Sequence, residues 1–428
     1  MSVSDRLAQI FGRRRFAMKP GTERISGLLA RLGHPERAFS SIHVVGTNGK
    51  GSTASFLSAI LTAAGCSTGL FTSPHLINYS ERFQVNGIRI APDVLEQQID
   101  RVLSVADPED TFFELTTALA CCHFADAGVR IAILEAGMGG RSDATAAVPG
   151  FCTVITPVSL DHCQWLGTTS AEIAAEKVAI AEPGTMVISS SQNQGAQVAI
   201  AEHCRHGARR LLLFGQDFRA FWEQDGTLCC CDGELRLSGL TPGIAGRYQA
   251  GNAAIAIAAA LQASQKTGLC LKEEHIRTGI TAARWPGRME LIYLENGSRL
   301  LLDGAHNPAG AQALADSLQV YERHRLILIL GMMEDKDLDG VIAPLVQLAD
   351  LIYTVAPAQE RAISARRLAV GCMKMGGAAT AQGSVAEGLA AARAVAEPGD
   401  LLLVAGSLFA VGEVKAALAG QISEAVRG

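Results

Sequence analysis

Apolar residues occur along this chain in short, nearly continuous runs, and helical segments separate these runs. The first five runs have the length of strands and lie at 42–45, 68–73, 129–135, 152–157 and 186–189. The helical segments between them lie at 53–61, 112–127 and 171–181. Strands that are apolar on both faces and alternate with helices are typical of a parallel sheet covered on both sides. The pattern therefore predicts an α/β domain with a mainly parallel sheet.

The pattern changes after residue 209. A short strand is expected at 211–214, and mixed polar and aromatic residues follow it, with turn signals at Asp225-Gly226 and Asp232-Gly233. These signals predict a small antiparallel β part that ends near residue 240. Helices are expected at 252–266 and 272–283, and the apolar run 253–261 indicates that the first of them is buried.

A second α/β series begins after Arg284-Trp285-Pro286-Gly287-Arg288, because Pro-Gly is a turn signal and the alternation restarts beyond it. Its strands are expected at 299–303, 326–331, 351–355 and 401–405, and its helices at 307–321, 338–348 and 384–396. We therefore predict a first domain at 1–284, a linker at 285–288 and a smaller, Rossmann-like domain at 289–428. Gly-x-Gly-x-x-Gly does not follow the first strand of the smaller domain, so dinucleotide binding is not indicated.

Composition narrows the class of protein. The 428 residues are 48% hydrophobic and 18% charged, which is enough for two or three cores of a soluble protein. The net charge of -5 argues against binding nucleic acid without sequence preference. The N-terminus lacks the apolar region of a signal peptide, and no run approaches the roughly 18–20 apolar residues of a membrane span. We expect a cytoplasmic monomer with no membrane partner.

The cysteines point to a reducing compartment. Their number, 11, is odd, and they are scattered without the spacing of a disulfide framework. Cys229, Cys230 and Cys231 invite a metal site, but successive side chains of a strand point to opposite faces, so a structural zinc is not favoured.

The segment Gly46-Thr47-Asn48-Gly49-Lys50-Gly51-Ser52 stands between the strand at 42–45 and the helix at 53–61. A glycine loop in this position presents backbone N–H groups to phosphate, and Lys50 adds a positive charge for the β- and γ-phosphates. The pattern departs from the usual phosphate loop at one position. Gly51 stands where a serine or threonine hydroxyl normally binds magnesium, so the metal must take its ligands from elsewhere in the chain.

Other strand ends carry candidate ligands, because ligands sit beyond the carboxyl ends of parallel strands. Glu135 ends a buried strand, where a carboxylate is costly unless a cation neutralises it. The magnesium of a nucleotide is favoured over the alternative, a salt bridge to Arg141. The residues alone leave the roles of Ser73 and His162 open. For Lys177, in a largely apolar helix, they favour a lysine whose amine reaches the surface.

The second domain has its own polar cluster, Asp303-Gly304-Ala305-His306-Asn307-Pro308, at the end of an apolar strand. One interpretation is a helix cap made by Asn307, with Pro308 in the first turn. Asp303 and His306 so close to a strand end also indicate a site that faces the first domain.

These motifs, in this order, closely resemble the folylpolyglutamate synthetase family, a branch of the Mur ligase superfamily that includes bifunctional dihydrofolate synthases. The resemblance runs from about residue 23 to the end. Besides the phosphate loop and the 303–308 cluster, it covers Thr72-Ser73-Pro74-His75-Leu76, residues 135–145, Leu160-Asp161-His162, Pro286-Gly287-Arg288 and Gly406-Ser407-Leu408.

The resemblance implies roles that spacing does not give. It implies two magnesium ions, with ligands at Ser73, Glu135 and His162. It implies that Lys177 is carried as a carbamate and that the catalytic residues are Lys50, Lys177 and His306. Contacts to ATP are implied at Thr47, Asn48, Gly49, Lys50, Gly51, Ser52, Asn252, Arg288 and Asp303, the last two placing ATP between the domains. Contacts to dihydropteroate are implied at Thr111, Phe112, Phe113, Glu114, Ser142, Asp143 and Ala144. A further pteroate segment of the family is matched poorly by residues 17–20 and is not carried over.

The implied activity is ATP-dependent addition of L-glutamate to dihydropteroate, which forms dihydrofolate, and to reduced folates as γ-linked polyglutamate. A substrate carboxylate attacks the γ-phosphate to give an acyl phosphate, and the glutamate amine then displaces phosphate. The alternatives are a folylpolyglutamate synthase alone, another Mur-type amino acid ligase, and a nucleotide-binding switch without catalysis. A cell-wall Mur ligase is disfavoured because only 45 residues precede Gly46, too few for a UDP-sugar domain.

Overall fold

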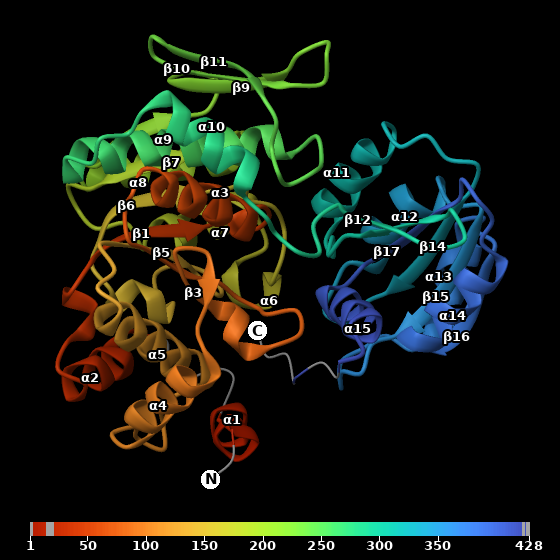
Figure 1. Cartoon of the computed structure of the whole chain (residues 1–428), viewed down its shortest axis with the longest axis horizontal. Helices are drawn as coiled ribbons and strands as arrows, with labels where there is room; N and C mark the ends of the chain where they lie inside the picture. The colour runs from red at the N-terminus through yellow and green to blue at the C-terminus, as the bar shows by residue number, and fades with distance from the viewer. Residues whose placement is uncertain (1–2, 14–20, 422–423, 425–428) are drawn as a thin grey trace.

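Two large sheets with helices on both faces form the main body of the protein, and the 285–288 segment connects them (Figure 1). The structure is a computed structural model that describes residues 3–13, 21–421 and 424. Residues 17–20, which the sequence analysis set aside, lie outside the described residues. The first sheet has the strand order β4-β3-β2-β5-β1-β6-β7-β8, and the second has the order β12-β13-β17-β14-β15-β16.

The first sheet is mainly parallel, as the apolar runs predicted. Its parallel strands are β1 (Ser40–Val45), β2 (Thr68–Phe71), β5 (Ile131–Glu135), β6 (Gly150–Ile155), β7 (Met186–Ser189) and β8 (Arg210–Leu213). A short antiparallel hairpin of β3 (Phe83–Val85) and β4 (Ile88–Arg89) extends one edge. The expectation for the strand near 211–214 needs a correction. This strand, β8, pairs in parallel with β7 and so belongs to the large sheet, not to the antiparallel part.

Helices cover both faces of the first sheet because alternate residues of its strands are buried on opposite sides. Ile131 and Ile133 of β5 lie in one core cluster, whereas Ala132 and Leu134 lie in another. The first cluster contains α3 (Lys50–Ala63), α9 (Gln249–Thr267) and α10 (Glu273–Ala282). The opposite face carries α1 (Val3–Phe11), α2 (Glu23–Arg31), α4 (Pro92–Leu103), α5 (Phe112–Asp126), α7 (Ser170–Val178) and α8 (Gln194–His206). Short helices are α6 (Cys163–Leu166), η1 (Pro35–Arg37), η2 (Tyr79–Arg82) and η3 (Ala144–Ala147).

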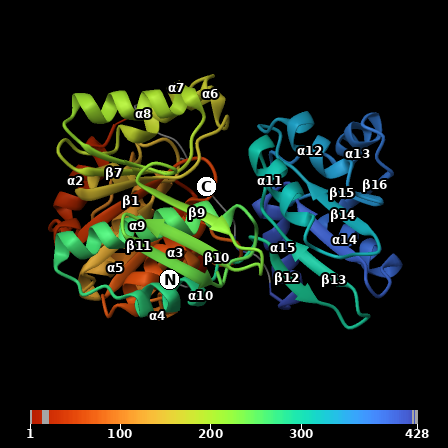
Figure 2. The same ribbon diagram turned by 90° about the horizontal axis from the view of Figure 1, so that it is seen from above.

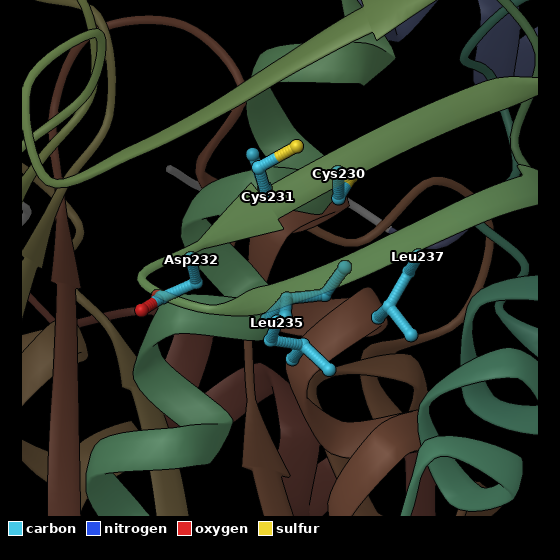
Figure 3. A pocket seen from close by; sticks show the side chains of 7 residues that line it. Cys230, Cys231, Asp232, Leu235 and Leu237 are labelled. Atoms are coloured by element: carbon cyan, nitrogen blue, oxygen red, sulfur yellow. The ribbon is translucent and has the colours of Figure 1, made fainter.

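The predicted antiparallel part is a separate three-stranded sheet, which Figure 2 shows lying over α9. Its strands are β9 (Phe218–Trp222), β10 (Leu228–Asp232) and β11 (Leu235–Leu240). Cys229, Cys230 and Cys231 lie on β10, and the first two are buried. A pocket of about 10 Å³ beneath the sheet, lined by Cys230, Cys231, Asp232, Leu235, Leu237, Ala254 and Ile257, has room for at most one water (Figure 3). Among the described residues, no group of three His, Cys, Asp or Glu side chains is placed to hold a metal ion.

The second sheet is parallel except at one edge. β12 (Glu290–Tyr293) runs antiparallel to β13 (Arg299–Leu302), and the parallel strands β17 (Leu401–Ala405), β14 (Leu326–Gly331), β15 (Leu351–Ala356) and β16 (Ala379–Ser384) follow. One face packs on α11 (Pro308–Leu318), α12 (Leu338–Val346) and α13 (Ala365–Lys374). The other packs on α14 (Val385–Val395) and α15 (Leu408–Leu418). The predicted fold class, a large α/β domain with a small antiparallel part and a smaller α/β domain, is confirmed.

The loop after Ser73 reaches across to the second domain. Leu76 and Ile77 are buried in the same core cluster as Val404 and Val411 of that domain. Gly412 of α15 comes so close that a Cβ atom placed on it would lie 2.3 Å from the Leu76 carbonyl oxygen. The first domain thus contributes two apolar side chains to the core of the second. In the part of the chain that the structure describes, no helix has the length and apolar character needed to cross a membrane.

Candidate active site

The phosphate loop joins the end of β1 to the start of α3, and α9 supports it from behind. Gly49 has φ +84, and a Cβ atom there would lie 2.4 Å from Asn252 Oδ1 of α9, so this position requires glycine. Asn252 donates a hydrogen bond to Gln249 Oε1 at 2.8 Å, and Gln249 donates one to Ser52 Oγ at 3.3 Å. This chain of amides fixes the loop against α9.

The N–H groups of the loop divide into two sets. Those of Thr47 and Asn48 donate to the Pro157 carbonyl at 2.9 and 3.2 Å, and Thr47 Oγ1 also donates to the Ser159 carbonyl at 3.1 Å. These bonds tie the loop to the segment that follows β6. The N–H groups that remain for an anion begin at Gly49, the N-cap residue of α3, and continue into the first turn of the helix, where N–H groups have no intrahelical acceptor.

Trp285 explains why glycine follows Lys50. A Cβ atom at Gly51 would lie 2.4, 2.5 and 2.7 Å from Cζ2, Cε2 and Nε1 of the Trp285 indole. The indole of the 285–288 segment therefore occupies the place where a serine or threonine side chain would start. This contact excludes the usual magnesium-binding hydroxyl from the phosphate loop.

Glu135 and Ser73 meet at the ends of two neighbouring strands, β5 and β2. The Ser73 N–H donates to Glu135 Oε2 at 3.2 Å. Burial raises the pKa of Glu135, and the charges of Lys50 and Arg288 oppose that rise. The alternative salt bridge is not formed, because Arg141 pairs with Glu176 at 3.7 Å instead. A buried carboxylate beside a serine, without a protein ion pair among the described residues, is a donor set that suits magnesium.

His162 lies in the segment that follows β6, in a left-handed conformation with φ 50. The pKa of His162 is lowered to about 4: partial desolvation is the largest cause, although 40% of the side chain stays exposed, the charge of Asp161 opposes the shift, and the charges of Lys336 and Lys50 add to it. Its imidazole is therefore neutral at physiological pH, which is the form that binds metals. The structure brings His162 into the neighbourhood of Lys50 but shows no direct contact with Glu135.

Lys177 is buried, with 5% of its surface exposed, so its interpretation as a surface lysine is wrong. The pKa of Lys177 is lowered from 10.5 to about 7. Burial is the largest cause and the charge of Lys50 adds to it, while the charges of Asp161 and Asp143 oppose the shift. The glycine segment after Glu135 covers α7, and a Cβ atom at Gly140 would lie 2.3 Å from the Lys177 carbonyl. The lowered pKa makes the neutral, nucleophilic amine of Lys177 far more accessible near physiological pH than that of an ordinary lysine.

In the second domain, Asp303 is held by three donors. Its carboxylate accepts from the Tyr248 hydroxyl at 3.0 Å, from the Met289 N–H at 3.0 Å and from the Ala305 N–H at 2.8 Å. Arg288 lies over the following residue, since a Cβ atom at Gly304 would be 2.3 Å from Arg288 Nη1. Asp303 and Arg288 are thus adjacent at the junction of the two domains.

Asp161 of the first domain contacts two side chains of the second domain. Lys336 Nζ lies 2.6 Å from its Oδ1, and His306 Nε2 lies 3.5 Å from its Oδ2. Burial alone would raise the pKa of Asp161, but the hydrogen bond and charge of His306, with Lys336 and His162, lower that pKa below its ordinary value. Lys336 was not among the predicted site residues, although it lies shortly after β14, where the rule that ligands sit beyond strand ends could have found it.

The two segments expected to bind dihydropteroate are brought together, and their polar groups also hold local turns. A Cβ atom at Gly137 would lie 2.6 Å from Phe113 Cζ, so the 111–114 segment packs on the 137–145 segment. Thr111 and Glu114 form the capping box of α5. Asp143 accepts from Thr145 Oγ1 at 2.6 Å and from the Met138 N–H at 3.0 Å. Phe112 and Ala144 are buried, and Ser142 is exposed.

The two parts of the chain match known protein families. Residues 44–260 match the Mur ligase middle domain, and residues 287–408 match the glutamate ligase domain of Mur ligases. Two features of the structure agree with these matches. The phosphate loop follows the first strand of the middle domain, and the polar strand end at 303–306 of the second domain faces that loop. The protein is therefore of the Mur ligase class.

Curated relatives narrow the class further. The chain is 33% identical over 407 residues to the dihydrofolate synthase/folylpolyglutamate synthase of Escherichia coli, covering 92% of this chain and 90% of the relative. It is 36% identical over 419 residues to a probable bifunctional folylpolyglutamate synthase/dihydropteroate synthase of Halobacterium salinarum, covering 94% of this chain and 50% of the relative. The chain thus spans about half the length of the Halobacterium relative. It belongs to the dihydrofolate synthase/folylpolyglutamate synthase family.

Solved structures agree along the whole chain. E. coli FolC in complex with DHPP and ADP has a TM-score of 0.89 and 31% identity, with 98% of each chain covered. The bifunctional folylpolyglutamate synthase/dihydrofolate synthase of Yersinia pestis, complexed with AMPPNP and Mn ion, has a TM-score of 0.88 and 31% identity, with 98% of each chain covered.

Proposed function

We propose that this protein is an ATP-dependent ligase that adds L-glutamate to dihydropteroate and to reduced folates through an acyl phosphate. The observation that carries the proposal is the convergence of Lys50, Glu135 and Lys177 at the carboxyl edge of the large sheet, opposite His306 of the second domain. Family membership supports the choice of substrates, because E. coli and Y. pestis relatives are named for both activities.

The chain's own residues have distinct tasks in this proposal. The N–H groups from Gly49 onward and Lys50 bind the phosphates of ATP and neutralise the charge that develops on the transferred group. Thr47, Asn48, Gly51 and Ser52 of the phosphate loop and Asn252 of α9 belong to the same nucleotide site, and Arg288 and Asp303 place ATP between the domains. His306 orients the incoming glutamate. Positioning of this kind accounts for most catalysis of phosphoryl transfer.

We propose that two magnesium ions accompany ATP, with Ser73, Glu135 and His162 as protein ligands and a carbamate on Lys177 as a further anionic group. When bound, magnesium would neutralise the phosphate oxygens. The burial of Glu135 and the neutral state of His162 support the ligand set. The burial of Lys177 and the lowered pKa of its amine support the carbamate, since only a neutral amine reacts with carbon dioxide.

We propose that the acceptor's pteroate part binds between the Thr111, Phe112, Phe113 and Glu114 segment and the Ser142, Asp143 and Ala144 segment. The contact of Phe113 with Gly137 supports this placement. We also propose the domain division at 1–284, 285–288 and 289–428; the family matches end at 260 and start again at 287, two residues before the proposed smaller domain. The expected protein is a cytoplasmic monomer with small-molecule partners, and without nucleic acid or membrane partners.

The test is phosphate release by the purified full-length chain with ATP, magnesium and glutamate, in parallel reactions with dihydropteroate, with tetrahydrofolate and with neither. The proposal expects release only when glutamate and an acceptor are both present, with either acceptor. If phosphate is released in the tetrahydrofolate reaction but not in the dihydropteroate reaction, the protein is a folylpolyglutamate synthase without dihydrofolate synthase activity. Release that does not depend on either acceptor would refute the folate ligase.

A separate test addresses Lys177. Mass spectrometry of the intact, bicarbonate-equilibrated enzyme, under conditions that preserve carbamates, should show an adduct that the Lys177→Ala variant lacks. An unmodified amine in fully active enzyme would reject the carbamate.

A further inference from the structure

Asn307, at the start of α11, has a side chain whose hydrogen-bonding capacity is completely used. Its Oδ1 accepts from the Gly310 N–H at 2.8 Å and from Asn48 Nδ2 at 3.1 Å. Its Nδ2 donates to Asn48 Oδ1 at 2.9 Å and to Asp161 Oδ2 at 3.4 Å. An asparagine side chain has two donors and two acceptor lone pairs, so no capacity remains. Three of its four bonds cross from the second domain to the first.

Capping α11 does not account for asparagine at this position. The cap uses only the bond from Gly310, and serine or aspartate would supply it as well. The other long helices of the second domain are in fact capped by Asp337, Ser364, Ser384 and Ser407. What only an amide provides at position 307 is the pair of N–H donors directed at Asn48 and Asp161.

The partner of this amide lies in the phosphate loop itself. The backbone N–H of Asn48 is held by the Pro157 carbonyl, and its side chain extends to Asn307 and to Ser159 Oγ, 3.2 Å away. Asn307 is 2% exposed, and Asn48 is half-buried. His306 precedes Asn307 and lies against Asp161, which means that the amide pair fixes the distance between the His306 segment and the loop of Lys50.

We propose that Asn307 is a positioning residue that docks the second domain onto the phosphate loop through Asn48. The docked arrangement places the strand end at 303–306 opposite Lys50, where the ligation step proposed above requires both domains. The inference rests on the proposed function only for its turnover assay, since docking itself can be measured without turnover.

Two substitutions separate docking from capping. Asn307→Asp and Asn307→Ser both keep an oxygen that accepts from Gly310, so α11 should form in each. Asp also removes both donors and places a second carboxylate beside Asp161, whereas Ser only loses the contacts. The matched control is Asn193→Asp at the exposed start of α8, where the side-chain oxygen alone caps the helix.

Small-angle X-ray scattering of the nucleotide-free, full-length variants should give a larger radius of gyration for Asn307→Asp than for the wild type and for Asn193→Asp. In the ligation assay, kcat should fall by about tenfold to a hundredfold for Asn307→Asp, the factor that follows from losing a buried polar contact. The fall should be smaller for Asn307→Ser, and the KM for glutamate should rise more than the KM for ATP, because the loop still binds phosphate.

Wild-type scattering and wild-type kcat in Asn307→Asp would overturn the docking role and leave Asn307 as a cap alone. If Asn307→Asp does not fold, the same two readouts in Asn307→Ser decide. If the wild type performs no ligation, the proposed function fails, and scattering by itself still decides whether Asn307 docks the domains.

Discussion

The contact between Gly51 and Trp285 permits a sharp test, because two effects of known sign oppose each other there. Gly51 is the second residue of α3, where replacing glycine by alanine should stabilise the helix by up to about 1 kcal/mol. The new methyl group would stand within 3.0 Å of three atoms of a rigid indole ring. Overpacking of this kind costs about 1–3 kcal/mol, and we expect the upper half of that range because the clash is with a ring that α3 and the linker hold in place.

Gly51→Ala should therefore destabilise the protein by roughly 1–2 kcal/mol, which lowers the Tm by roughly 2–8 °C. In a Trp285→Ala background the clash is absent, and the same substitution should raise the Tm. The matched control is Gly251→Ala in α9, where nothing lies within 4 Å of the added methyl group, so stabilisation is expected. Calorimetry of the four variants and the wild type measures this reversal of sign. A higher Tm for Gly51→Ala with Trp285 intact would refute the steric explanation of the phosphate loop.

Three further predictions concern charged side chains. Lys50→Ala should abolish ligation and leave the circular dichroism spectrum unchanged, because this lysine serves charge and not packing; near-normal phosphate release would remove it from the phosphate site. Lys177→Met should stabilise the protein most below about pH 7 and progressively less towards pH 10.5. The pKa of Lys177 is lowered from 10.5 to about 7 in the folded protein, so between these two pH values the unfolded chain binds more protons than the folded one. The wild type therefore gains stability as the pH rises through this range, and the advantage of the variant shrinks. Urea denaturation in bicarbonate-free buffer measures this trend, and a constant difference across the window would contradict it. Lys336→Met should lower the free energy of unfolding by about 1–3 kcal/mol, since it leaves the buried Asp161 with weaker partners, and Asp161→Asn should recover part of the loss; full additivity of the two would show that they do not interact.

The strands of both sheets could be predicted because each buried strand is a local apolar run. β7, β14 and β17 have the bounds that their runs indicate. Elements with little local signal were missed. Ile88 is 74% exposed in the two-residue strand β4, and the edge strand β16 has the polar sequence Ala379–Ser384, so neither shows an apolar run.

The site was predictable only as far as single positions carry chemistry. Lys50 and Glu135 stand at strand ends, which is a local property. The burial of Lys177 is not a local property, because the 137–140 segment that packs on the backbone of α7 at Lys177 is distant in sequence. The pair Asn48 and Asn307 is separated by 259 positions, and each residue alone has an adequate local explanation, one in a glycine loop and the other at a helix start. A hydrogen-bonded pair that joins two domains cannot be predicted from the local sequence pattern around either residue.

Leu76 and Ile77 couple the stability of the two domains. Burying an apolar side chain of this size contributes about 1.5–3 kcal/mol, and here both contributions accrue to the second domain although the first domain's chain supplies them. A fragment that contains only the second domain, from residue 289 on, would retain all six strands of its sheet. Its hydrophobic core would nevertheless have a cavity where Leu76 and Ile77 pack in the full chain. The boundary between the domains along the sequence, at 285–288, therefore differs from the boundary between their hydrophobic cores. We expect the two domains to unfold together and not as independent units.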